Sequence, residues 1–178
     1  MEFTLGILVD NEAGVLARVA SLFSRRGYNI QSLAVGPTDD PGTSWITLRA
    51  EGGDGVRIQM QRQLDKLVEV VAVYHMAEGA SVERELALIK VRTDGGRRAE
   101  VMQIAQTFRA AVIDVSPRSV VLETTGDSAK VNALIEVMRD FGVLEVARAG
   151  AVAMLRGPGV FRGDGEEAEG DRPQAQAH

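Results

Sequence analysis

The sequence predicts an α+β protein in which two βαββαβ units of ferredoxin-like topology follow one another along the chain. Three observations predict this fold. Each half begins with apolar residues at every second position, which is typical of a strand with one buried face. Apolar residues at helical spacing follow twice in each half, and the same order of elements recurs after about 75 residues. Because aromatic residues make up only 4% of the 178 residues, aliphatic side chains must fill both cores.

The first half begins with a strand predicted over residues 2–9. The residues of its buried face alternate along the chain: Phe3, Leu5, Ile7 and Val9. A helix follows and ends at Gly27, a residue type that is favoured after the last helical turn. The apolar face predicted for this helix consists of residues three and four positions apart: Leu16, Val19, Ala20 and Phe23.

Two extended segments, 28–37 and 43–51, come next and are separated by the turn-forming sequence TDDPG. A second helix is predicted after the helix-breaking sequence GGDG. Its buried face is again a set at helical spacing: Val56, Met60, Leu64 and Leu67. The β-branched run 68–76 completes the first unit as a strand.

The second half repeats this order. Its strands are predicted over four segments: 84–92, 110–116, 118–125 and 144–155. Its two helices are predicted from two apolar faces: Val101, Ile104, Ala105 and Phe108, then Val131, Leu134, Ile135 and Met138. We therefore expect one domain over residues 1–77 and another over 78–157. Residues 158–178 are rich in Gly, Pro and acidic side chains without apolar periodicity, and we expect a disordered tail there.

The composition excludes several classes of function. The chain has no cysteine, which excludes disulfides, thiolate metal sites and cysteine nucleophiles. A formal net charge of -5 gives no overall attraction to a nucleic-acid backbone. No stretch approaches the roughly 20 apolar residues of a membrane helix. We expect a cytoplasmic protein that binds neither nucleic acid nor membrane.

Familiar catalytic patterns are missing as well. The two histidines, His75 and His178, do not fit into a Ser-His-Asp arrangement, and no P-loop or GxGxxG sequence follows a predicted strand. The two basic pairs are interpreted as solvated helix ends: Arg25 with Arg26, and Arg97 with Arg98. An enzyme is therefore the weaker interpretation.

The turn before the first helix is a candidate binding site. Asn11 ends the first strand, and the helix begins near Gly14, so the first N–H groups of the helix have no intrahelical acceptor. Such groups attract an anion, and Gly14 would allow a small carboxylate to approach closely. The alternative is that Asn11 caps the helix and that Gly14 is an ordinary first-turn glycine. Both interpretations remain open from spacing alone.

Four segments carry a resemblance to a known family: NEAGVLARVASLFSRRGYNIQSLAVGPTDDPGTSWITL, QLDKLVEVVAV, ERELALIKV and AAVIDVSP. The chain resembles the small regulatory subunits of acetolactate synthase, also called acetohydroxyacid synthase, from about residue 2 to Arg156. The resemblance implies an N-terminal ACT domain, an amino-acid-sensing form of the ferredoxin-like fold, followed by an ACT-like domain.

It further implies a subunit without an active site or a cofactor of its own. Such a subunit binds the large catalytic subunit, which carries thiamine diphosphate, Mg and FAD. It activates that subunit for branched-chain amino acid biosynthesis and confers feedback inhibition by valine. Leucine and isoleucine remain alternative effectors.

The resemblance also assigns the effector site. The loop that holds the polar groups of valine is matched by five residues: Asn11, Ala13, Gly14, Val15 and Leu16. Asn29 and Ile30 match a segment supplied by a second ACT domain across a homodimer interface. The chain departs from the family at Trp45, where an Arg is usual, and in its acidic tail.

Two other classes of function remain. One is a stand-alone ACT-type amino-acid sensor that regulates another partner. The other is an enzyme of ferredoxin-like fold that uses a carboxylate base. Pyruvate condensation by the chain without a large subunit would favour the enzyme.

Overall fold

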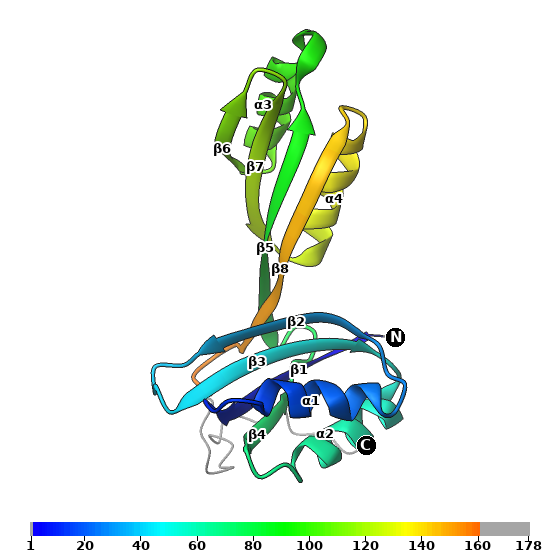
Figure 1. Ribbon diagram of the computed structural model, residues 1–178, viewed down its shortest axis with the longest axis vertical. Helices are drawn as coiled ribbons and strands as arrows, with labels where there is room; N and C mark the ends of the chain where they lie inside the picture. Colours follow the sequence, from blue (N-terminus) through cyan, green and yellow to red (C-terminus); the bar gives the residue numbers. More distant parts are fainter. Residues whose placement is uncertain (1, 161–178) are drawn as a thin grey trace, which may run out of the picture. The chain divides into compact units, whose positions relative to one another are not determined.

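A computed structural model describes residues 2–160 and confirms two successive βαββαβ units (Figure 1). One compact unit takes in the chain up to Val82 and again from Ala153, and the other is Glu83–Val152. The expected domains, 1–77 and 78–157, differ from these units because they assign the end of the last strand to the second domain. The division of function between the two domains stays a prediction. Nearly all of the predicted tail, from residue 161 on, lies outside the described residues.

The first unit is a four-stranded antiparallel sheet in the order β2-β3-β1-β4, with two helices on one face. Because β1 lies inside the sheet and β2 lies at its edge, the loop after β1 and the start of β2 belong to different parts of the unit. The elements follow in this order: β1 (Glu2–Asp10), α1 (Val15–Ser24), β2 (Ile30–Pro37), β3 (Thr43–Glu51), α2 (Asp54–Leu64) and β4 (Val70–His75).

The second unit repeats the plan with the strand order β6-β7-β5-β8. A short 3₁₀ turn, η1 (Asp94–Gly96), precedes its first helix. The other elements follow in this order: β5 (Ser81–Arg92), α3 (Arg98–Thr107), β6 (Ala111–Ser116), β7 (Ser119–Gly126), α4 (Ser128–Arg139) and β8 (Val143–Leu155). Among the described residues, no helix has the length and apolar character needed to cross a membrane.

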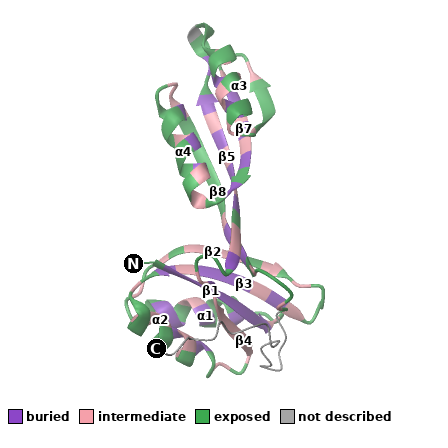
Figure 2. Ribbon diagram, turned by 180° about the vertical axis from the view of Figure 1, so that it is seen from behind, coloured by how far each residue is buried: buried purple, intermediate pink, exposed green. Residues whose placement is uncertain are grey.

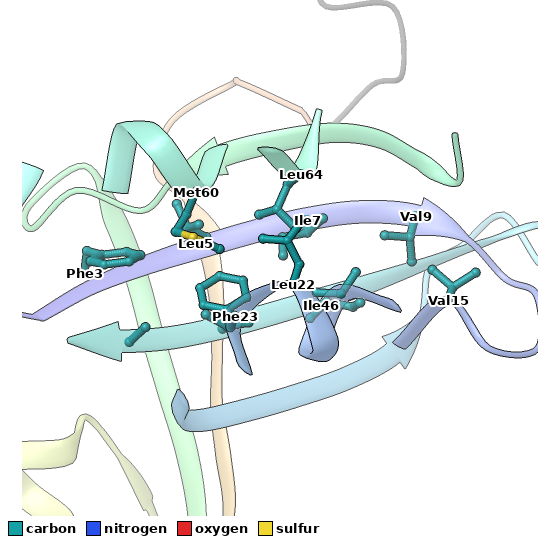
Figure 3. Close-up of a cluster of buried hydrophobic side chains, with 13 residues drawn as sticks. Phe3, Leu5, Ile7, Val9, Val15, Leu22, Phe23, Ile46, Met60 and Leu64 are labelled. Atoms are coloured by element: carbon teal, nitrogen blue, oxygen red, sulfur yellow. The ribbon is translucent and has the colours of Figure 1, made fainter. Parts of the chain in front are cut away.

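Aliphatic side chains dominate both cores, as the composition requires. In the first unit the helices press Phe23, Met60 and Leu64 onto Leu5 and Ile7 of β1, all of them fully buried (Figure 3). The buried core of the second unit, as far as the structure describes it, is aliphatic, with Phe108 and Phe141 only partly buried against it. Its buried residues are Ala87, Ile89, Val91, Val101, Ala105, Val120, Leu122, Val131, Leu134 and Met138. Figure 2 shows that the outer surfaces of the helices are exposed in both units.

The prediction of a single buried face for the first strand is wrong. Thr4, Gly6 and Leu8 are buried as well as the residues that face the helices. The reason lies on the helix-free face of the sheet, where Trp45 and Met76 pack over Gly6. A Cβ on Gly6 would lie inside van der Waals distance of both side chains, so only glycine fits there.

The face predicted for the first helix is wrong at one position. Leu16 is 40% exposed, whereas Val15, Val19, Leu22 and Phe23 are buried (Figure 3). Both sets have helical spacing, so periodicity alone does not choose between them. The start of the helix at Val15, directly after the turn at Gly14, determines which set faces the sheet.

Candidate functional site

The loop between β1 and α1 leaves the start of the helix open. Gly14 has a φ of 89°, a left-handed conformation that favours glycine. Within residues 2–160, no side chain caps α1 and no acidic residue lies in its first turn. The Val15 N–H donates only weakly to the Glu12 carbonyl, at 3.5 Å, which is longer than the usual range of about 2.7–3.2 Å. The first turn of α1 can therefore receive an external anion.

Asn11 joins this loop to the turn between β2 and β3. Its backbone N–H donates to the Gly42 carbonyl at 2.8 Å, and Nδ2 donates to the Pro41 carbonyl at 3.1 Å. Its Oδ1 accepts from Ser44 Oγ at 3.0 Å. The alternative in which Asn11 caps the helix is therefore wrong, because its side chain bonds to the β2–β3 turn instead. An amide group has two N–H donors, so one remains for a ligand.

The other predicted loop residues differ in exposure. Ala13 is exposed in the turn, and Leu16 is exposed on the first turn of α1. The Val15 side chain points into the core, where it is 4% exposed (Figure 3). Only the main-chain groups of Val15 are therefore available to a ligand.

Asn29 and Ile30 lie at the opposite end of α1 from Gly14. The helix has 10 residues and so is about 15 Å long, which separates the two halves of the predicted site within one chain. Asn29 is exposed, and Ile30 packs partly against the core at the start of the edge strand β2. One copy of the chain does not bring the two halves together.

An ion pair beside the loop was not predicted from the sequence. Arg18 Nη1 contacts Glu69 Oε1, and Arg18 Nη2 lies 4.0 Å from where a Cβ on Gly14 would stand. The carbonyl of Glu69 accepts the Asp10 N–H at 2.9 Å, which fixes this residue next to the loop. One feature of the sequence pointed to such a partner. Arg18 lies near the start of the helix, where a cation is unfavourable because it opposes the helix dipole, so a nearby carboxylate would stabilise it.

Trp45 is a packed residue of the helix-free face. Its Nε1 donates to Thr47 Oγ1 at 3.1 Å and to the Ala153 carbonyl at 3.2 Å. Thr47 Oγ1 in turn accepts the Ala153 N–H at 3.1 Å, and the indole lies 6.0 Å from the ring of Tyr74. The Trp45 indole therefore binds the end of β8 as well as Thr47.

The basic pair at the start of α3 is not simply solvated. Arg98 Nη2 donates to the carbonyls of Ser116 and Pro117 at 2.7 and 2.8 Å, and Arg97 Nη1 donates to the Asp140 carbonyl at 3.1 Å. The pair was expected at a solvated helix end. It lies at a helix start instead and binds backbone carbonyls there.

Other features of the described residues do not form a competing site. No group of three or more His, Asp or Glu side chains within residues 2–160 could hold a metal ion. A surface concavity of 580 Å³ along α2 contains none of the predicted site residues. Partial burial, and secondarily the nearby Arg57, lower the pKa of His75.

Comparisons with known proteins match each half of the chain to a family. Residues 5–72 match the family described as the AHAS small subunit-like ACT domain, and residues 84–157 match the family described as the small subunit of acetolactate synthase.

The similarity extends over whole relatives. A probable acetolactate synthase small subunit of Archaeoglobus fulgidus is 48% identical over 88% of this chain and 98% of its own length. The acetolactate synthase small subunit of Mycobacterium bovis is 48% identical over 87% of this chain and 92% of its own. The crystal structure of the small subunit from Thermotoga maritima matches with a TM-score of 0.81 and 42% identity, over 88% of this chain and 98% of that one.

Proposed function

The chain belongs to the family of acetolactate synthase small subunits, and from this premise we propose how it regulates the large catalytic subunit. It binds that subunit, raises its activity and makes it sensitive to inhibition by valine. Valine, or another branched-chain amino acid, binds between the first units of two copies.

The open start of α1 is the observation that supports the effector site most strongly. An amino-acid carboxylate there would accept the N–H groups of the first turn and lie at the positive end of the helix dipole. Gly14 keeps the approach clear: among the described residues beyond its chain neighbours and the helix backbone, only the end of the Arg18 side chain comes as near as 4.0 Å to where its Cβ would stand. The second N–H of Asn11 Nδ2 is a further donor.

The separation of the two halves of the site supports a homodimer. Asn29 and Ile30 reach the loop of Asn11 and Gly14 only if a second copy supplies them, because α1 lies between them within one chain. They stand at the start of β2, an edge strand of the sheet, and edge strands can pair with a strand of another chain. A symmetric dimer would contain two such sites.

Inhibition then follows from a shift between two arrangements of the dimer. Valine stabilises the arrangement that the catalytic subunit binds less well, and the catalytic subunit weakens valine binding in return. Couplings of this kind are typically about 1–3 kcal/mol, which corresponds to a several-fold to about hundredfold change in affinity.

Reconstitution with the large catalytic subunit tests this function. Pyruvate condensation is measured for each subunit alone and for the mixture, with valine, leucine, isoleucine or alanine added. We expect no activity from this chain alone, activation in the mixture, and inhibition by a branched-chain amino acid but not by alanine. Activity of the chain alone would support the enzyme alternative. Valine binding without any effect on the catalytic subunit would support the stand-alone sensor.

A further inference from the structure

We propose that Arg18 and Glu69 recognise the two charges of the amino-acid effector, and this inference rests on the proposed function. Arg18 binds the α-carboxylate and Glu69 binds the α-ammonium group. Neither residue belongs to the site that the resemblance assigns.

Position is the first argument. The Arg18 guanidinium reaches back over the first turn of α1, with Nη2 4.0 Å from where a Cβ on Gly14 would stand. An anion held by the first N–H groups of the helix would therefore lie beside a cation. Glu69 is fixed beside the start of the loop, where its carbonyl accepts the Asp10 N–H, and its carboxylate contacts Arg18.

Electrostatics is the second argument. A cation is unfavourable at the positive end of a helix, and α1 has no acidic residue in its first turn to offset it. Glu69, from outside the helix, offsets part of this charge through its ion pair with Arg18. The Glu69 carboxylate therefore pairs with the guanidinium, while the helix start has no carboxylate in its own first turn. The carboxylate of an amino acid would supply one.

Accessibility is the third argument. The Arg18 side chain is 57% exposed and can turn toward a ligand, whereas the Glu69 side chain is only 15% exposed. An amino acid can enter this ion pair without leaving a charge unpaired, because its ammonium group replaces the guanidinium at Glu69 while its carboxylate binds Arg18. A ligand that lacks either charge leaves one member of the pair without its partner.

Calorimetric titration with three ligands tests the assignment. Valine has both charges, 3-methylbutanoate lacks the ammonium group, and valinamide lacks the carboxylate. We expect the parent to bind valine at least tenfold more tightly than either analogue. Glu69→Gln should weaken valine at least tenfold but bind 3-methylbutanoate at least as tightly as the parent does, because no unpaired carboxylate is left behind. Arg18→Gln should weaken valine similarly but bind valinamide at least as tightly as the parent does, because no unpaired guanidinium is left behind.

Controls separate charge recognition from structural damage. Arg18→Lys and Glu69→Asp keep the charges and should retain most of the discrimination. Lys90→Gln and Glu145→Gln break an ion pair between β5 and β8, with Nζ and Oε2 3.1 Å apart, and should bind all three ligands as the parent does. Glu12→Gln removes another carboxylate of the loop and should have less effect than Glu69→Gln.

The outcomes distinguish this inference from the function on which it rests. If the parent binds no branched-chain amino acid, the proposed function is wrong. If the parent binds valine but Arg18→Gln and Glu69→Gln keep its preference for valine over the analogues, the role of the ion pair is wrong and the function stands.

Discussion

At the scale of single residues, Gly14 allows the most direct change to the effector site. Gly14→Asp places a carboxylate beside Arg18, where the carboxylate of the effector should bind, and like charges there repel. We expect the variant to activate the catalytic subunit normally but to lose inhibition by valine. Activity titrated with valine measures both properties.

Gly79→Asp is the matched control for that variant. Gly79 also has a positive φ, of 81°, and no atom lies within 4 Å of where its Cβ would stand. The backbone cost should therefore be similar, while valine inhibition stays as in the parent. Equal valine sensitivity of Gly14→Asp and the parent would contradict the assignment of the loop.

His75 gives a prediction for the pH dependence of stability. Partial burial and the nearby Arg57 lower its pKa in the folded state below the ordinary value of 6.5, and Asp54 opposes this shift. The unfolded chain therefore binds the proton more readily, so the free energy of unfolding falls as the pH drops through 6.5. Urea unfolding at pH 7.5 and 5.5 should show a larger decrease for the parent than for His75→Gln. An equal decrease would show that His75 does not contribute.

Local sequence points to only part of the candidate site. The turn at Asn11 and Gly14 could be found because its residue types indicate a strand end and a helix start. The ion pair of Arg18 and Glu69 joins residues 51 positions apart. It depends on β4 pairing beside β1, and no local pattern contains that register.

At the scale of the elements, the stability of the sheet around β1 depends on the packing of Trp45 over Gly6. Gly6→Ala should displace the indole and Met76, at a cost of about 1–3 kcal/mol in the free energy of unfolding. Gly36→Ala is the control, because Gly36 lies opposite Trp45 on β2 with no atom within 4 Å of its Cβ position. Similar urea midpoints for the two variants would contradict this packing.

The orientation of α1 gives a second prediction at this scale. Phe23 is fully buried against the sheet, whereas Leu16 is 40% exposed. Phe23→Ala should lower the free energy of unfolding by about 3–5 kcal/mol, and Leu16→Ala by no more than about 0.5 kcal/mol. Thermal or urea unfolding can measure both. A larger loss for Leu16→Ala than for Phe23→Ala would mean that Leu16 faces the sheet, as the sequence prediction placed it.

The order of all the predicted strands and helices is confirmed. It could be predicted because the apolar residues of each element have a clear period and turn sequences lie at its ends. The burial of both faces of β1 could not be predicted, since it depends on Trp45 and Met76, which are distant in the sequence. The hydrogen bonds of Arg98 to the carbonyls of Ser116 and Pro117 could not be predicted either, because these residues are also distant in the sequence.

At the scale of the whole molecule, two units with one topology have different helix starts. The start of α1 has no acidic residue in its first turn, whereas α3 has Glu100 in its first turn and two arginines that bind backbone carbonyls. The same fold therefore has a helix start without a side-chain cap in the first unit and one with internally bonded arginines in the second. We expect the effector to bind the first unit.

Binding across two copies is the central claim, and a mixed dimer tests it most directly. Gly14→Asp damages the loop half of each site, and Asn29→Ala damages the half from the partner. Dimers of either variant alone should bind no valine. A dimer with one copy of each, purified with two different tags and titrated by calorimetry, has one doubly damaged site and one intact site. It should bind one valine per dimer. If the mixed dimer binds none while the parent dimer binds two, both halves of each site come from one chain and the account is wrong.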